Sequence, residues 1–279
     1  MRNILDIYNE FVGKNLLPVD WKQQLYKLLS SYEPEDIGTL EEHRMYIETL
    51  HKLRSYVAED MKLNGKNFLD TIASLLAVGN DGLYSSDLRF IYELIQNVDD
   101  CEYEDTEDCQ LNIKFEYDPL PGRIIFTYNE KGFKPSNVFA ITGIAEESKN
   151  ISADKIEIGE KGIGFKSVFG VAEKVHIESG MFSFELCKDN FTVPIPKYEK
   201  YEPVQGTRLT IYLDNKHNAK KIHEDLFNQY GGKDAILKQN PILFLNKLTY
   251  LEMYFDNWRK IVFKVEKRNL GVNDEIVFE

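Results

Sequence analysis

The stretch "GEKGIGFKSVFG", residues 159–170, has three glycines, two lysines and a serine among its first nine residues, and it lies between a run of alternating apolar residues and a short aromatic segment. A glycine-rich loop that runs into a helix presents unpaired backbone N–H groups and the positive end of the helix dipole, which together suit a phosphate. The glycine spacing is neither that of the P-loop nor that of the dinucleotide-binding loop. The stretch therefore predicts an anion-binding loop, and the type of binding domain to which it belongs depends on the rest of the chain.

The composition is that of a globular protein. The chain has 279 residues, of which 43% are hydrophobic and 13% aromatic, enough to bury the core of one large domain or two smaller ones. The net charge of -12 and the pI near 5.0 argue against a protein that coats duplex DNA, although they leave room for a local basic groove.

The cysteines and the N-terminus indicate a cytoplasmic protein. Cys101, Cys109 and Cys187 are odd in number and lack the paired spacing of metal ligands, which predicts reduced thiols. Charges interrupt the apolar residues of "MRNILDIYNEFVGK", and no segment approaches the run of about eighteen apolar residues that spans a bilayer. We therefore expect neither secretion nor membrane insertion.

Periodicity predicts an α+β protein. Apolar residues at three- and four-residue steps predict helices up to about residue 78 and again up to about residue 100, with a further helix at residues 217–229. Alternating patterns predict strands in "LNIKFEY" and "RIIFTY", joined by the turn "DPLPG", and later in "KVHIES", "MFSFELC", "TRLTIYL", "TYLEMYF" and "RKIVFKV". Helices that come mostly early and strands mostly late favour α+β layers over strict β-α-β alternation.

The segment "RFIYELIQNVDDC" carries the first candidate site. On a helix, Glu93, Asn97 and Asp100 share one face, whereas the apolar residues pack inward. A carboxylate one turn from an amide can polarise a water while the amide oxygen binds Mg²⁺. When this segment is taken alone, a solvated polar face explains it better than a site does.

Two further segments contain glycines at turns. In "YNEKGFKPSNVFAITGIAEESK", Gly132 lies between a strand and Pro135, and a long polar stretch with Gly143, Ser148 and Lys149 leads back to the opening loop. A loop of that length in a compact domain is typical either of a lid or of a disordered segment. In "VQGTRLTIYL", Gly206 and Thr207 begin a strand.

Taken in order, these pieces resemble the GHKL ATPases, the group of gyrase, the ninety-kilodalton heat-shock chaperones, histidine kinases and MutL. "ELIQNVDD", "NEKGF", "GEKGIGFKSVF" and "NPILFLNKL" are similar to the sacsin-type and NO VEIN-type ATP-binding domains. The resemblance covers roughly residues 66–265. It implies a Bergerat fold, a two-layer sandwich of a mostly antiparallel sheet and helices, preceded by a helical extension at residues 1–65 and followed by a segment at residues 266–279 that starts another part of a longer protein.

The resemblance also implies ATP and Mg²⁺ as ligands and a role for each matching residue. Glu93 would be the catalytic general base, Asn97 the Mg²⁺ ligand, and Asp100 part of the pocket lining. Thr207 would bond near the adenine, and Ser148 with Lys149 would belong to the lid. The remaining nucleotide-binding positions would be Asn129, Gly132, Phe133, Gly159, Lys161, Gly162, Ile163, Gly164, Phe165 and Lys166.

One position departs from the wider group. The aspartate that accepts a hydrogen bond from the adenine amino group would align with Tyr128, so the expected carboxylate is missing. Asn129 could take its place, because an amide offers both an acceptor and a donor. Adenine specificity is therefore less firmly predicted than triphosphate binding.

The predicted function is slow Mg²⁺-dependent ATP hydrolysis that drives lid closure and either dimerisation or contact with downstream domains, in a chaperone-like or microbial defence protein. Two alternatives remain open. One is an interaction module that binds nucleotide without hydrolysis, and the other is a histidine kinase with His51 in "HKLRS" as phosphoacceptor, which Lys52 disfavours. Neither a membrane partner nor nucleic acid is expected for this domain.

Overall fold

The structure is a computed structural model that describes residues 32–63, 88–104, 108–143, 163–230, 245–254, 260–270 and 273–278, with Ile4, Asp6, Tyr8, Asn9 and Leu29. The chain forms two compact units. The first contains residues 1–82, 133–166 and 176–203, and the second contains residues 83–132, 167–175 and 204–279. Strand β3 (Ala172–Ser179) contributes residues to both.

The first unit is built around helix α3 (Leu40–Leu63), which belongs to the predicted helical extension. Thr39 and Glu42 form a capping box at its start, in which the Thr39 N–H donates to Glu42 Oε2 at 2.8 Å and the Glu42 N–H donates to Thr39 Oγ1 at 3.2 Å. The buried residues Tyr46, Ile47, Leu50 and Leu53 recur at helical spacing. Helix α3 packs on β5 (Asn190–Pro196) and β4 (Phe182–Cys187), which pair antiparallel.

Two short helices complete the described part of the first unit. Helix α6 (Pro135–Ile141) begins at a proline, a residue that suits the first turn of a helix, and the Pro135 carbonyl accepts a hydrogen bond from the Tyr46 hydroxyl at 3.1 Å. Helix α7 (Ile163–Lys166) is a single turn. Strand β5 was not predicted, because Pro194 and Pro196 interrupt its pattern, and prolines are tolerated at the edge of a sheet, where β5 lies.

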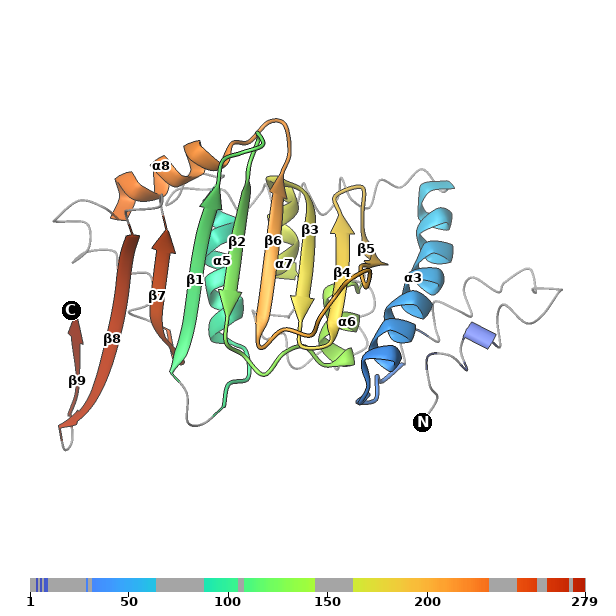
Figure 1. Cartoon of the computed structure of the whole chain (residues 1–279), viewed down its shortest axis with the longest axis horizontal. Coiled ribbons are helices and arrows are strands. Elements are labelled where there is room, and N and C mark those ends of the chain that lie inside the picture. Colours follow the sequence, from blue (N-terminus) through green and yellow to red (C-terminus); the bar gives the residue numbers. More distant parts are fainter. Residues whose placement is uncertain are drawn as a thin grey trace, which may run out of the picture. The chain divides into compact units, whose positions relative to one another are not determined.

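The second unit is a mixed sheet with helices (Figure 1). Its strand order is β6-β2-β1-β7-β8-β9, in which β1 and β7 are parallel and the other neighbours antiparallel. The strands are β1 (Cys109–Glu116), β2 (Arg123–Tyr128), β6 (Thr207–Leu213), β7 (Leu248–Tyr254), β8 (Lys260–Leu270) and β9 (Asn273–Phe278). The predicted α+β class is confirmed.

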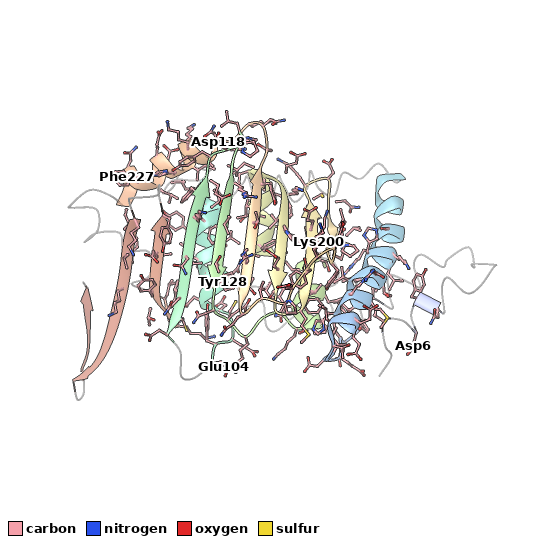
Figure 2. The ribbon with its side chains drawn as sticks, in the orientation of Figure 1. Asp6, Glu104, Asp118, Tyr128, Lys200 and Phe227 are labelled. Carbon is pink, nitrogen blue, oxygen red and sulfur yellow. The ribbon has the colours of Figure 1, made fainter. Side chains whose placement is uncertain are left out.

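The helices of this unit are α5 (Arg89–Asp99), α8 (Ala219–Tyr230) and the 3-10 turn η2 (Ser167–Gly170). Both α5 and α8 pack against β1. The residues of β1 that are fully or almost fully buried, Leu111, Ile113 and Phe115, alternate with polar ones, so the sheet has one apolar and one polar face. Figure 2 labels Asp118 in the β1–β2 turn and Tyr128 at the opposite end of β2.

The sequence predicted domain boundaries near residues 65 and 265. Residue 65 lies outside the described residues. Strand β8 runs through residue 265 without a break, and β9 pairs with its later part. No helix among the described residues is long and apolar enough to cross a membrane.

Candidate functional site

Helix α5 presents Glu93 and Asn97 on its partly exposed side. The opposite side is buried and includes Ile91, Leu94, Ile95 and Val98, as the periodicity predicted. The Glu93 carboxylate lies 3.5 Å from the Arg89 Nε atom, and its side chain is 30% exposed. Side chains four residues apart on a helix are neighbours, so the carboxylate and the amide share one patch of accessible helix surface.

The two aspartates at the end of α5 differ sharply. Asp100, the predicted pocket residue, is exposed and forms the C-cap. Asp99 is 4% exposed, and its carboxylate accepts the backbone N–H groups of Asn246, Lys247 and Leu248 at 2.7–2.8 Å. Asp99 therefore fixes the start of β7 to the end of α5. The sequence contained the signal, since Asp99 lies one turn after the inward-facing Ile95.

The end of β2 holds a buried polar cluster that links it to the start of β6. The Thr207 hydroxyl donates to Glu130 Oε1 at 2.5 Å, and Thr207 and Glu130 are 1% and 8% exposed. Thr207 is also hydrogen-bonded to the phenol of Tyr128, its register partner on β2. Burial and, secondarily, the Glu130 charge raise the pKa of Tyr128 well above its usual value, so the phenol stays protonated.

Gly206 allows this cluster to form. Its φ is +76°, and a Cβ at this position would lie 2.2 Å from the Tyr128 carbonyl oxygen and 3.1 Å from the Asn129 Cα. Only a glycine accommodates both the backbone conformation and the close approach of the two chain segments. In the sequence alone, a Gly-Thr pair at the start of a strand is typical of an ordinary turn. In the structure, the glycine of this pair is required for the close packing of the two chain segments.

The Asn129 amide is committed to the neighbouring backbone. Its Oδ1 accepts the Gln110 N–H at 2.8 Å, and its Nδ2 donates to the Asp108 carbonyl at 2.9 Å. The carboxylate in this part of the chain is that of Glu130, which the sequence analysis did not single out. A glutamate two positions after Tyr128 was visible in the sequence, but only its burial and its contact with Thr207 distinguish it from a surface residue.

Gly132 and Phe133 continue from this cluster along the chain. Gly132 has a φ of +91°, as expected for a glycine that reverses the backbone after a strand. The Phe133 N–H donates to the Ser179 hydroxyl at 2.7 Å within the first unit.

The opening loop is described only from Ile163 onward. Gly164, Phe165 and Lys166 lie in α7, and Lys166 is 4% exposed. The Lys166 ammonium donates to the Gly143 carbonyl and lies 5.5 Å from the centre of the Phe191 ring. The predicted residues Ser148, Lys149, Gly159, Lys161 and Gly162 lie outside the described residues.

His51, the alternative phosphoacceptor, is partly buried in the first unit. Its Nδ1 lies 3.0 Å from the Pro194 carbonyl oxygen, so this ring nitrogen carries the proton and donates. In the part of the chain that the structure describes, no three His, Cys, Asp or Glu side chains are grouped to hold a metal ion.

Comparison with known proteins shows a similarity to part of a plant protein. The chain is 39% identical over 103 residues to Protein NO VEIN of Arabidopsis thaliana, and the aligned segment covers 37% of this chain and 4% of that protein. No family in a comparison with protein families matches the chain. The chain therefore shares partial homology with a small part of a much longer plant protein.

Proposed function

We propose that the chain is a Mg²⁺-dependent ATP-binding and ATP-hydrolysing domain of the GHKL type, with a Bergerat fold similar to the sacsin-type and NO VEIN-type domains. The observation that carries the proposal is the buried Thr207–Glu130 pair, in the same unit as the accessible Glu93 and Asn97 of α5. A buried hydroxyl–carboxylate pair can recognise a base, and a carboxylate beside an amide on an accessible helix surface suits water activation and metal binding.

The residues of α5 fit a magnesium ion that is held mainly by phosphates. Mg²⁺ usually keeps several waters and takes one or two protein oxygens together with substrate phosphates, so a single amide from Asn97 is a sufficient protein contribution. Bound Mg²⁺ would neutralise the phosphate charge during hydrolysis. Glu93 would accept the proton of the attacking water, and Arg89 would hold the carboxylate in position through their contact.

Glu130 and Thr207 would recognise adenine. The carboxylate would accept a hydrogen bond from the exocyclic amino group, and Thr207 would fix its orientation. Asn129 is assigned a structural role in place of the base contact, because both ends of its amide bond to the backbone of residues 108 and 110.

The phosphate contacts would come from the glycine loop and the lid. Gly159, Gly162 and Gly164 would offer backbone N–H groups, and Lys161 would add positive charge. Lys166 would act indirectly, because its ammonium is bound to the Gly143 carbonyl. ATP-driven lid closure and dimerisation or domain contact would then occur within a larger cytoplasmic protein, with a chaperone-like or defence role.

Calorimetry with ATP in the presence and absence of Mg²⁺, together with a phosphate-release assay, tests this proposal on the full chain. We expect Mg²⁺-dependent binding and slow turnover. Glu93→Gln should retain binding and lower turnover by about 10²- to 10⁴-fold, because it removes only the base. Asn97→Ala should lose the Mg²⁺ dependence. Gln96→Ala, an exposed substitution on the same helix, should change neither and serves as the matched control.

One result would overturn the role of Glu93, and another would overturn hydrolysis itself. If Glu93→Gln hydrolyses ATP as fast as the unchanged chain, Glu93 is not the base. If ATP binds with Mg²⁺ dependence but the unchanged chain releases no phosphate, the non-hydrolysing module replaces the ATPase. Absence of nucleotide binding at millimolar ATP would reject both.

A further inference from the structure

The polar face of the sheet in the second unit carries cations and tyrosines in registered rows. Directly paired residues of neighbouring strands project to the same side, so the pairings define which side chains share this face. One row contains Arg208, Thr127, Asn112, Glu252 and Val262, a second contains Thr210, Ile125, Lys114, Tyr254 and Lys260, a third contains Tyr212, Arg123 and Glu116, and a fourth contains Gln110, Tyr250 and Lys264.

The helices of the unit lie on the other side. The ring of His223 in α8 lies 5.6 Å from that of Phe115, which belongs to the apolar side of β1. Figure 1 shows α5 behind β1 and β2. The described helices α5 and α8 thus leave the polar face open, on the side opposite the Thr207–Glu130 pair, since Thr207 alternates with the outward-facing Arg208.

The face is cationic although the chain is acidic. Among the described residues of these rows, together with Lys174, which lies over the Tyr212 ring, there are six cationic and two acidic side chains, a net charge of +4 in a chain whose net charge is -12. The Glu116 carboxylate lies between two of the cations, 2.9 Å from Lys114 Nζ and 2.5 Å from Arg123 Nε. Glu252 pairs with Lys260. The two carboxylates therefore hold lysine and arginine side chains in place without neutralising the face.

Tyrosines alternate with these cations. Lys174 Nζ lies 4.6 Å and Arg123 Cζ lies 6.0 Å from the centre of the Tyr212 ring. Tyr254, between Lys114 and Lys260 in the second row, is 37% exposed, and Tyr250 is partly exposed. The rows cross five strands spaced by about 4.8 Å, so charges and rings extend over about 19 Å.

We propose that this face binds single-stranded nucleic acid. Cations that follow the backbone, together with aromatic rings on which unpaired bases stack, are the two elements of single-strand binding, and an open sheet face with aromatic side chains is a known way to present both. Duplex DNA does not fit as well, because its bases are already stacked and a flat face cannot enter a groove. An acidic peptide would use the cations but not the rings.

The test is fluorescence anisotropy of the full chain, without ATP, with labelled single-stranded and duplex oligonucleotides of about 20 nucleotides over a range of salt concentrations. The variant Arg208→Glu, Lys264→Glu changes two cations of the face. The control Lys220→Glu, Lys221→Glu makes the same change of charge on the exposed surface of α8. The variant Tyr254→Ala removes one ring, and thermal unfolding checks that every variant folds.

We expect single-strand binding that is tighter than duplex binding. The face variant should weaken single-strand binding at least tenfold. It should also lower the slope of log affinity against log salt concentration by the amount expected for about two lost phosphate contacts. The affinity of the α8 variant should stay within about threefold of that of the unchanged chain. Tyr254→Ala should weaken binding at unchanged salt dependence. The proposal is overturned by a dissociation constant above about 100 µM at low salt, by equal losses in the face and α8 variants, or by a polyglutamate peptide that binds as tightly as the oligonucleotide.

Discussion

Thr207 and Glu130, which are 77 residues apart in sequence, form a buried hydrogen bond of 2.5 Å between the start of β6 and the end of β2. If this pair selects adenine, Glu130→Gln should weaken ATP binding more than GTP binding, because an amide turned toward Thr207 no longer offers a charged acceptor to the amino group. We expect about a tenfold loss of affinity for ATP, measured by calorimetry against both nucleotides.

Asn129→Ala separates the two neighbouring candidates. It should lower the free energy of unfolding by about 1 kcal/mol, because two exposed hydrogen bonds to the Gln110 N–H and the Asp108 carbonyl are lost and water replaces the partner, with little change in the preference for ATP over GTP. The reverse pattern, in which Asn129→Ala abolishes the preference and Glu130→Gln leaves it intact, would return base recognition to Asn129.

Gly206→Ala should strongly destabilise the protein. The new Cβ would meet the Tyr128 carbonyl oxygen at 2.2 Å, and the backbone would hold an alanine at a φ of +76°. The conformation alone costs about 1–2 kcal/mol, so with the clash we expect a loss above about 3 kcal/mol in chemical unfolding.

Gly170→Ala is the matched control, because a Cβ there meets nothing within 4 Å and the backbone does not have a positive φ. It should shift the free energy of unfolding by less than about 1 kcal/mol. Equal effects of the two substitutions would show that the contact between residues 206 and 128 is not what constrains Gly206.

Local sequence patterns predicted the helices and strands, whereas the roles of individual polar side chains depend on tertiary contacts that the sequence does not show. The amphipathic pattern of α5 and the alternation in β1, β2 and β6 could be predicted, because burial of one face makes apolar residues recur at regular spacing in the sequence. The buried contacts of Glu130 and Lys166 could not be predicted in the same way, since their partners Thr207 and Gly143 are distant in sequence. Similarly, the edge strand β5 was missed because its prolines hide the pattern.

Asp99 and Asp100 offer a direct test of that distinction, as adjacent residues of the same type. Asp99→Ala should lower the free energy of unfolding by about 3 kcal/mol or more, because three N–H groups at the start of β7, one in a buried and two in partly buried hydrogen bonds, lose a charged acceptor. Asp100→Ala should cost less than about 0.5 kcal/mol, since its side chain is exposed. Urea unfolding measures both, and equal losses would contradict the anchoring role of Asp99. Asp100 would keep its predicted pocket role only if its substitution weakens ATP binding without destabilising the fold.

The two lysines of "GEKGIGFKSVFG" should separate stability from nucleotide binding. Lys166 is buried, with its ammonium on the Gly143 carbonyl and beside the Phe191 ring, so Lys166→Met should lower the melting temperature because a partly buried carbonyl loses its charged donor. Lys161→Met should leave the melting temperature of the ATP-free chain unchanged and weaken ATP binding about tenfold, as expected for a cation that contacts phosphate. Thermal unfolding with and without ATP and Mg²⁺ reads out both effects, because a ligand that binds only the folded state raises the melting temperature. If Lys166→Met weakens ATP binding at an unchanged melting temperature, Lys166 leaves the Gly143 carbonyl to bind phosphate directly.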